Sequence, residues 1–323
     1  MTIELKLAEV IESAAARLVR PESVAFSPSG DLKAVANSGN NSISIFQRIG
    51  SSGSAYELTP CCMLQDHRYL AYVHGVDFSP DGRFLAAVGR ESHSLVIYPR
   101  SSRSGNQFSE EPSCLLSTSE YGLCFPADLA FHPSGRNLVV ANRDGDTAVS
   151  FFNRAPGGEG VYGFNPARSI PKRTFTDRNM SSPHGLTYTP DGRQLLLCHS
   201  RFFKSEDQTG GVGISVLEFQ DSNNRLSDTL QYTYHTDDLL VHSISIHPSG
   251  KWVGVTTCNG GAILFRHSES PCALEPCLTI PHQRKKAQEG PKGISFSRDG
   301  TTVEICNADH EINVYTFAIG QSR

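Results

Sequence analysis

Apolar and polar residues alternate over short stretches along most of the chain, and tight turns separate these stretches. In "GVDFSPDG", which starts at Gly75, an alternating run ends in Pro-Asp-Gly. A period of two is typical of a β-strand, and this turn reverses the chain because proline fixes φ and glycine accepts a positive φ. In the first unit the strands that follow the turn are "LKAVAN", "SISIFQR" and the less regular "CCMLQ". Each unit is thus predicted to form four antiparallel strands.

The unit occurs six times, with starts 50 to 58 residues apart. The aligned segments are "SVAFSPSG", "GVDFSPDG", "DLAFHPSG", "GLTYTPDG", "SISIHPSG" and "GISFSRDG"; in the last, Arg298 replaces the proline. Four-stranded units repeated around an axis form a β-propeller. The sequence therefore predicts an all-β fold, one six-bladed β-propeller domain over residues 1–323. Its blades start near residues 22, 74, 127, 184, 242 and 292.

The two ends of the chain complement each other. The sixth unit ends at "INVYTFAIGQSR", with no residues for a fourth strand, whereas residues 2–8, "TIELKLA", alternate without a unit of their own. We expect residues 2–8 to pair with residues 311–317 as the outer strand of the last blade, because closing the ring removes exposed sheet edges. The next stretch, "AEVIESAAARL", is expected to form a short helix. The alternative is a single helix over residues 3–18.

These motifs carry a family resemblance. The segments "FSPDG" and "FHPSGRNLVVANRDGDTAVSFF" resemble WD-repeat propellers and lactonase-like propellers of the phosphogluconolactonase type, over essentially the whole chain. The sequence has no Trp-Asp dipeptide, which departs from the WD-repeat pattern, and it has six units where those lactonases have seven. The resemblance implies the fold and transfers no catalytic residues.

The start of each blade holds the candidate chemistry. In a propeller the innermost strand starts beside the central axis and the second strand returns to the same face, so both ends are expected to meet at the channel mouth. The residues just before the innermost strands are Glu22, His74, Ala127, His184, His242 and Lys292, with Asp128 beside the alanine. The second strands end at or near Asn37, Arg90, Asn142, Arg143, His199, Arg201 and Asn307.

Three histidines and a glutamate on different blades suit a metal site. Neutral imidazole binds zinc, iron, copper or nickel, and three protein ligands leave room for a reactive water. We predict His74, His184 and His242 as ligands of such a divalent ion. The zinc of the six-bladed lyase domain of peptidylglycine amidation, held by three histidines, resembles this arrangement. The alternatives are a polar pocket without metal and histidines that merely cap the channel through hydrogen bonds to water.

The remaining candidates divide into two groups. Glu22, His199, Arg90 and Arg143 are candidate catalytic residues. The candidate ligand-binding residues are Lys292, Asp128, Asn37, Asn142, Asn307, Arg201 and Phe202. Long connections, including the insertion at residues 201–211, are expected on the same face. There Phe202 and Phe203 are a candidate apolar lid over the pocket; the alternative is a flexible segment whose two phenylalanines pack against the neighbouring blade.

Composition narrows the function. The formal net charge is −4 and the only dense basic run is at residues 284–286, which disfavours nucleic acid. The chain has no stretch of eighteen apolar residues, so no membrane span is predicted. Its nine cysteines lack the spacing of a zinc motif, which favours reduced thiols in the cytoplasm. We expect a small-molecule or peptide ligand at the channel mouth, and metal-assisted hydrolase or lyase chemistry if the protein is an enzyme. A non-enzymatic interaction scaffold of the WD-repeat type is the alternative. The sequence does not indicate an oligomeric state.

Overall fold

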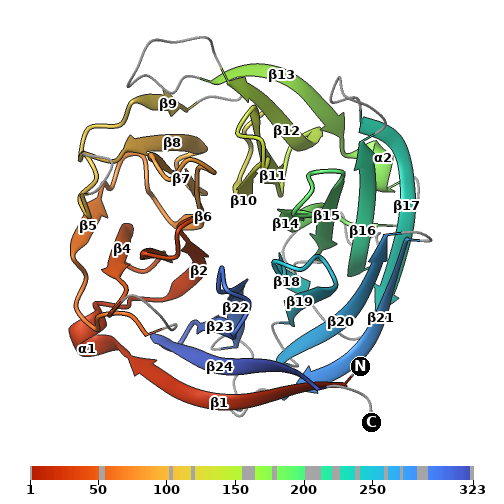
Figure 1. Cartoon of the computed structure of the whole chain (residues 1–323). Helices are drawn as coiled ribbons and strands as arrows, with labels where there is room; N and C mark the ends of the chain where they lie inside the picture. Colours follow the sequence, from red (N-terminus) through yellow and green to blue (C-terminus); the bar gives the residue numbers. More distant parts are fainter. Residues whose placement is uncertain are drawn as a thin grey trace.

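Six four-stranded antiparallel sheets stand around a central axis in the computed structural model (Figure 1). The structure describes residues 2–50, 55–101, 105–117, 121–154, 164–176, 180–200, 212–219, 226–236, 241–257, 261–269, 272–281 and 290–320. The predicted all-β propeller with six blades of four strands is confirmed.

The strands of each blade follow one another from the axis outward. Blade 1 has β2 (Pro21–Phe26), β3 (Leu32–Asn37), β4 (Ser42–Gln47) and β5 (Cys62–Gln65); blade 2 has β6 (Val73–Phe78), β7 (Phe84–Gly89), β8 (Ser94–Pro99) and β9 (Cys114–Leu116). Blade 3 has β10 (Pro126–Phe131), β11 (Asn137–Asn142), β12 (Thr147–Arg154) and β13 (Phe164–Pro171); blade 4 has β14 (Pro183–Tyr188), β15 (Gln194–His199), β16 (Val212–Phe219) and β17 (Leu226–Thr236). Blade 5 has β18 (Val241–Ile246), β19 (Trp252–Thr257), β20 (Gly261–Glu269) and β21 (Cys272–Ile280).

Blade 6 joins the two ends of the chain. It has β22 (Pro291–Phe296), β23 (Thr302–Asn307), β24 (Glu311–Gly320) and, as its outer strand, β1 (Thr2–Glu12). β1 runs antiparallel to β24, from Thr2 opposite Gly320 to Glu12 opposite Glu311. The predicted closure of the ring by the N-terminal strand is confirmed.

The segment after the predicted strand differs from expectation. β1 continues to Glu12, and the helix α1 has only four residues (Ser13–Ala16), so the alternative of one helix over residues 3–18 is wrong. The second helix, α2 (Arg173–Thr176), is equally short. A bulge between Leu7 and Glu9 shifts the register of the β1–β24 ladder, pairing continues to Glu12, and Ile11 packs against a core cluster. Pairing with β24 therefore outweighs the helix propensity of the alanine and glutamate residues.

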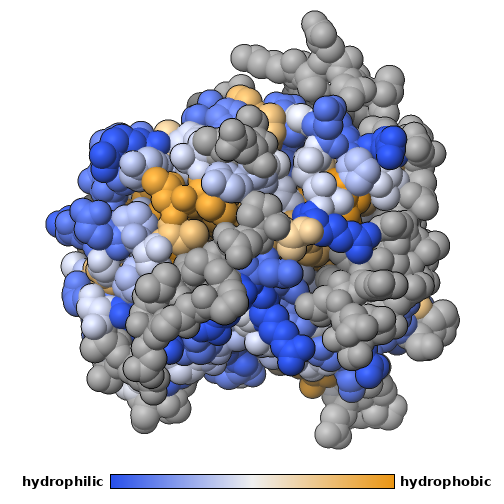
Figure 2. Space-filling view, turned by 90° about the horizontal axis from the view of Figure 1, so that it is seen from above, coloured by the Kyte–Doolittle hydropathy of each residue, from blue (hydrophilic) through white to orange (hydrophobic). Residues whose placement is uncertain are grey.

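The core lies between neighbouring blades. One cluster joins Leu32 and Ile43 of blade 1 to Phe78 of blade 2, and another joins Val24 of blade 1 to Ile312 of blade 6. Each fully buried aliphatic or aromatic side chain contributes roughly 1.5–3 kcal/mol, so these clusters hold the blades together around the whole ring. On the side shown in Figure 2, hydrophilic residues predominate among the coloured atoms, and apolar areas lie between them. Neither described helix has the length or the apolar character needed to cross a membrane.

Candidate metal centre

All six innermost strands carry a register irregularity at their first residues. A β-bulge inserts a residue that departs from strict alternation and re-aims its side chain. The irregularity coincides with the residues predicted to form the ring. The exposed fraction is 2% for Glu22, 4% for His74, 1% for His184 and 3% for His242, so the cluster is enclosed rather than open to solvent.

The three histidines meet on the axis. The ring centroids of His184 and His242 are 4.2 Å apart, those of His74 and His184 4.9 Å, and those of His74 and His242 5.3 Å. Each ring offers one nitrogen, and these three nitrogens lie within 4.8 Å of one another. The structure thus brings together three side chains that are 58 or more residues apart in the chain.

Glu22 completes the cluster. Its Oε2 lies 3.7 Å from His74 Nε2 and 3.6 Å from His242 Nε2, which is too long for a hydrogen bond. Two ligand atoms of one tetrahedral zinc ion, each at about 2.0–2.1 Å from the metal, lie about 3.4 Å apart. The spacing therefore fits two atoms that share a metal ion.

Two side chains hold the Glu22 carboxylate in place. Ser38 Oγ and the Tyr72 hydroxyl each donate to Glu22 Oε1, both at 3.2 Å. The guanidinium groups of Arg20 and Arg90 lie over the Tyr72 ring, 5.8 Å and 5.4 Å from its centroid. Sequence reasoning missed Ser38 and Tyr72. The backbone of Tyr72 adopts a positive φ of 53°, and no motif in the sequence predicts this conformation.

Hydrogen bonds fix the tautomers of two histidines. His184 Nδ1 lies 2.7 Å from the carbonyl oxygen of His242, which only accepts, so Nδ1 carries the proton. His74 bonds to the backbone of Ala127 in the same way. Metal-binding histidines commonly donate their second N–H to a carbonyl, which leaves the other nitrogen as ligand.

The imidazoles are neutral in the folded protein. Burial, with the charges of Arg90 and Lys292, lowers the pKa of His184 to about 3. Burial also holds the pKa of His74 and His242 well below the ordinary value, and neighbouring histidines and the same two cations add to this effect. Neutral imidazole is the form that binds metal ions.

The cluster leaves polar atoms unsatisfied. Glu22 Oε2, His74 Nε2 and His242 Nδ1 are buried and have no hydrogen-bond partner among the described residues. A buried polar atom without a partner costs about 1–3 kcal/mol, and proteins rarely keep several together without a reason. A cation between the carboxylate and the imidazoles would satisfy the first two of these atoms.

Three other candidates lie within their own blades. Asn37, Asn142 and His199 each bind one backbone group 18 residues earlier and one serine of the adjacent strand. The backbone partners are Val19 N, Cys124 N and Ser181 O, and the serines are Ser44, Ser150 and Ser215. The geometry gives these three side chains a bracing role, and their predicted catalytic or ligand-binding roles stay predictions.

The remaining candidates lie at different distances from the cluster. Arg90 and Lys292 are near enough to lower the histidine pKa values. The half-buried Arg143 donates its backbone N–H to Phe125 O. Asn307 lines a cavity between blades 5 and 6 instead of the axis. Arg201 and Phe202 lie outside the described residues.

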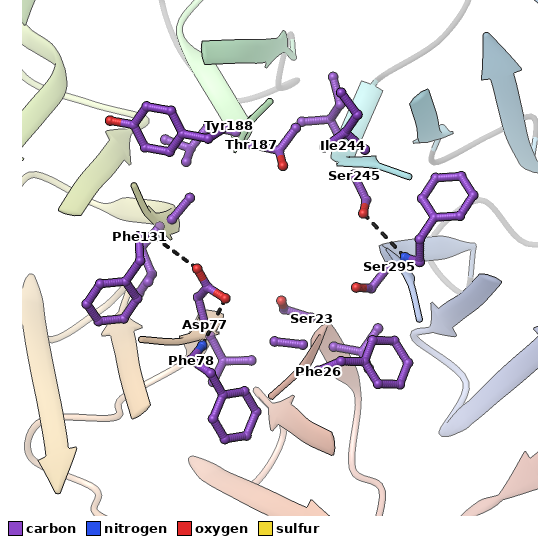
Figure 3. Close-up of a pocket in the computed structure, with 18 of the residues that line it drawn as sticks. Ser23, Phe26, Asp77, Phe78, Phe131, Thr187, Tyr188, Ile244, Ser245 and Ser295 are labelled. Atoms are coloured by element: carbon purple, nitrogen blue, oxygen red, sulfur yellow. Dashed lines mark hydrogen bonds between the residues drawn. The ribbon is translucent and has the colours of Figure 1, made fainter. Parts of the chain in front are cut away.

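A cavity of about 380 Å³ occupies the axis on the other side of the histidines (Figure 3). It is lined by the innermost strands and by the prolines of the tight turns that join the first and second strands of the blades. The cavity therefore opens on the face of the ring that carries these turns, called the turn face below. Its lining shares Ser23, Asp128 and Ser243 with the small space at the histidine cluster. Asp128, predicted to bind ligand beside the histidines, thus connects the two spaces. The ligand was expected on the long-loop face, and no pattern in the sequence indicated this cavity.

Comparison with known proteins supports the architecture. Residues 58–98 match the family model "WD domain, G-beta repeat". The chain resembles both WD-repeat and lactonase-type propellers. A search of the curated proteins gave no match.

Solved structures from three organisms are similar over most of the chain. The periplasmic gluconolactonase PpgL of Pseudomonas aeruginosa is 16% identical, with a TM-score of 0.63 over 92% of this chain and 81% of that one. A protein of unknown function from Desulfotomaculum acetoxidans is 15% identical (TM-score 0.61, 97% and 92% covered), and hydrazine synthase of Kuenenia stuttgartiensis is 14% identical (TM-score 0.55, 95% and 98% covered). At such identities the likeness shows the fold alone.

Proposed function

We propose that His74, His184 and His242 bind a divalent transition metal ion, with Glu22 as a further ligand or as a base beside it. The observation that carries the proposal is the buried carboxylate oxygen of Glu22, which lies 3.6 Å and 3.7 Å from two imidazole nitrogens without a hydrogen bond. Zinc suits this nitrogen and oxygen donor set, and iron, copper and nickel share its affinity for imidazole.

We further propose that the protein hydrolyses a small polar ester or lactone. A metal ion held by the three histidines would lower the pKa of a bound water toward neutrality. The chain contributes the Glu22 carboxylate, oriented by Ser38 and Tyr72, and the cations Arg90 and Lys292, which suit an anionic group on the substrate. The gluconolactonase among the similar structures supports a lactone as the first substrate to test.

Elemental analysis tests the metal site. The protein is purified without chelator or metal-affinity resin, and its metal content is measured for the unmodified chain, His184→Ala and His67→Ala. His67 is an exposed histidine and serves as the matched control. We expect near-stoichiometric metal in the unmodified chain and in the control, and its loss in His184→Ala. Absence of zinc, iron, copper and nickel at every metal load would overturn the site.

Hydrolysis is tested separately. Proton release from gluconolactone is followed with the metal-loaded protein, the chelated protein and His184→Ala. Activity that follows metal content supports the hydrolase. A metal-loaded protein that hydrolyses none of a panel of lactones and esters would remove the enzymatic part of the proposal and leave the metal site intact.

The WD-type match at residues 58–98 favours a second candidate, a scaffold that binds a peptide on its loop face. This function predicts a peptide ligand whose binding is unchanged in His184→Ala. The eight described cysteines are free thiols, which supports our proposal that the protein is cytoplasmic.

A further inference from the structure

The axial cavity on the turn face has a polar inner wall. Figure 3 shows oxygen atoms of Ser23, Asp77, Thr187 and Ser295 directed toward the open centre, whereas the rings of Phe26, Phe78, Phe131 and Tyr188 point away from it. The polar groups that face the centre are hydrogen-bond acceptors and hydroxyl groups, and none of the four labelled aromatic rings is directed toward them.

Asp77 and Asp128 are the carboxyl groups of this wall, on the innermost strands of blades 2 and 3. Because an innermost strand is a sheet edge, some of its N–H groups need partners outside the sheet. Asp77 accepts from Phe78 N (2.8 Å) and Phe131 N (2.9 Å). Asp128 does the same with Leu129 N (2.9 Å) and Leu186 N (3.1 Å). Each carboxylate thus links its blade to the next one.

The two carboxylates have more hydrogen-bond acceptor positions than these backbone contacts use. Each oxygen accepts one backbone bond, and an ionised carboxylate has about four acceptor positions. The remaining positions are available to a molecule in the cavity. The side chains themselves are half-buried, which agrees with their place on the cavity wall.

The two carboxylates lack a matching positive charge. Within the described ranges neither forms an ion pair. Arg298, which replaces the proline of the sixth repeat, lies at the cavity rim, where its Nε donates to Phe26 O at 3.3 Å. Burial raises the pKa of Asp77 to about 6 in spite of the Arg298 charge, and burial raises that of Asp128 to about 7. The cavity therefore favours a guest that brings positive charge.

We propose that this cavity binds a small organic cation with a primary ammonium group, held by Asp77 and Asp128. An ammonium group has three donors, which match two carboxylates on adjacent blades and a neighbouring hydroxyl such as that of Ser23. A volume of about 380 Å³ lies at the small end of ligand pockets. Quaternary ammonium ligands are recognised by aromatic faces, and the four labelled rings point away from the centre of this cavity. A neutral polyol would leave both carboxylates without counter-charge.

Calorimetric titration of the full chain tests the proposal. The probe is 1,4-diaminobutane, and 1,4-butanediol is its neutral counterpart, at about pH 8, which lies above the raised pKa of Asp77 and of Asp128. We expect saturable binding of one diamine per chain and no binding of the diol. Asp77→Asn should weaken the diamine affinity at least tenfold. Asp81→Asn, which changes an exposed turn carboxylate outside the cavity, should leave it unchanged.

A second variant guards against a folding defect in Asp77→Asn. Arg298→Ala removes a positive charge from the rim and should strengthen diamine binding several-fold, a result that a misfolded protein does not give. Equal binding of diol and diamine would identify a polyol pocket and overturn the proposal. Stronger binding of Mg²⁺ or Ca²⁺ than of the diamine, or no heat from the diamine at millimolar concentration, would also overturn it.

Discussion

Replacing His184 by glutamine should reduce the loss of folding stability in acid. The folded protein holds the pKa of His184 at about 3, whereas the unfolded chain has the ordinary value of 6.5. Below pH 6.5 His184 binds a proton in the unfolded chain but not in the folded protein. The contribution of neutral His184 to the free energy of unfolding is therefore complete above pH 6.5 and is lost as the pH falls toward 3. At pH 5 this loss is about 2 kcal/mol. Burial of His74 and His242 acts in the same direction.

Urea unfolding of the chelated protein at pH 7 and pH 5 measures this effect. The difference in the free energy of unfolding between the two pH values should be smaller by about 2 kcal/mol in His184→Gln. His67→Gln, at an exposed position, should leave the difference unchanged. A glutamine amide can still donate to the His242 carbonyl, which favours folding of the variant. A pH difference within about 0.5 kcal/mol of the unmodified chain would refute the buried, neutral cluster.

Three further substitutions test the fold around the site. Lys33 Nζ and Glu304 Oε1 are 3.1 Å apart between blades 1 and 6, and both side chains are buried, with exposed fractions of 2% and 1%. Lys33→Met should therefore lower the free energy of unfolding in urea by about 3–5 kcal/mol, because it leaves Glu304 without its ion partner. The double variant Lys33→Met/Glu304→Leu should recover most of that free energy. A Cβ on Gly75 would lie 2.8 Å from Asp128 Cα, so Gly75→Ala should cost about 1–3 kcal/mol, seen as a lower Tm. Asn142→Ala should cost about 1–3 kcal/mol, because a loop amide and a serine lose their partner. An unchanged stability in any of the three single variants would contradict the corresponding contact.

The architecture was predictable because the same local chemistry recurs six times. Alternation, a proline to fix φ and a glycine to reverse the chain define each inner hairpin, and the missing outer strand of the last unit identifies the partner of residues 2–8. The extent of β1 was not predictable. Residues 9–12 have side chains compatible with a helix, and their strand conformation depends on pairing with β24, whose paired residues are 299 to 305 positions away in the chain.

The candidate site was predictable only in part. Equivalent positions in the repeats identified Glu22 and the three histidines, but equivalence does not give the direction of a side chain. Asn37 and His199 end their strands near the axis, yet they bind within their own blades. Asp77 was overlooked, although an aspartate between Val76 and Phe78 on an inner strand is the signal that could have revealed the cavity.

The histidine cluster divides the axis into two parts of opposite charge. Arg90 and Lys292 act on the cluster from its loop side, whereas Asp77 and Asp128 line the cavity on its turn side. A metal cation is repelled by the first pair and attracted by the second, and an anionic substrate has the opposite preference. For the proposed metal ion, this arrangement predicts entry through the turn-face cavity, and for an anionic substrate it predicts approach from the loops. On that proposal the carboxylates of the cavity would attract cations, and the buried, oriented imidazoles would select a transition metal among them.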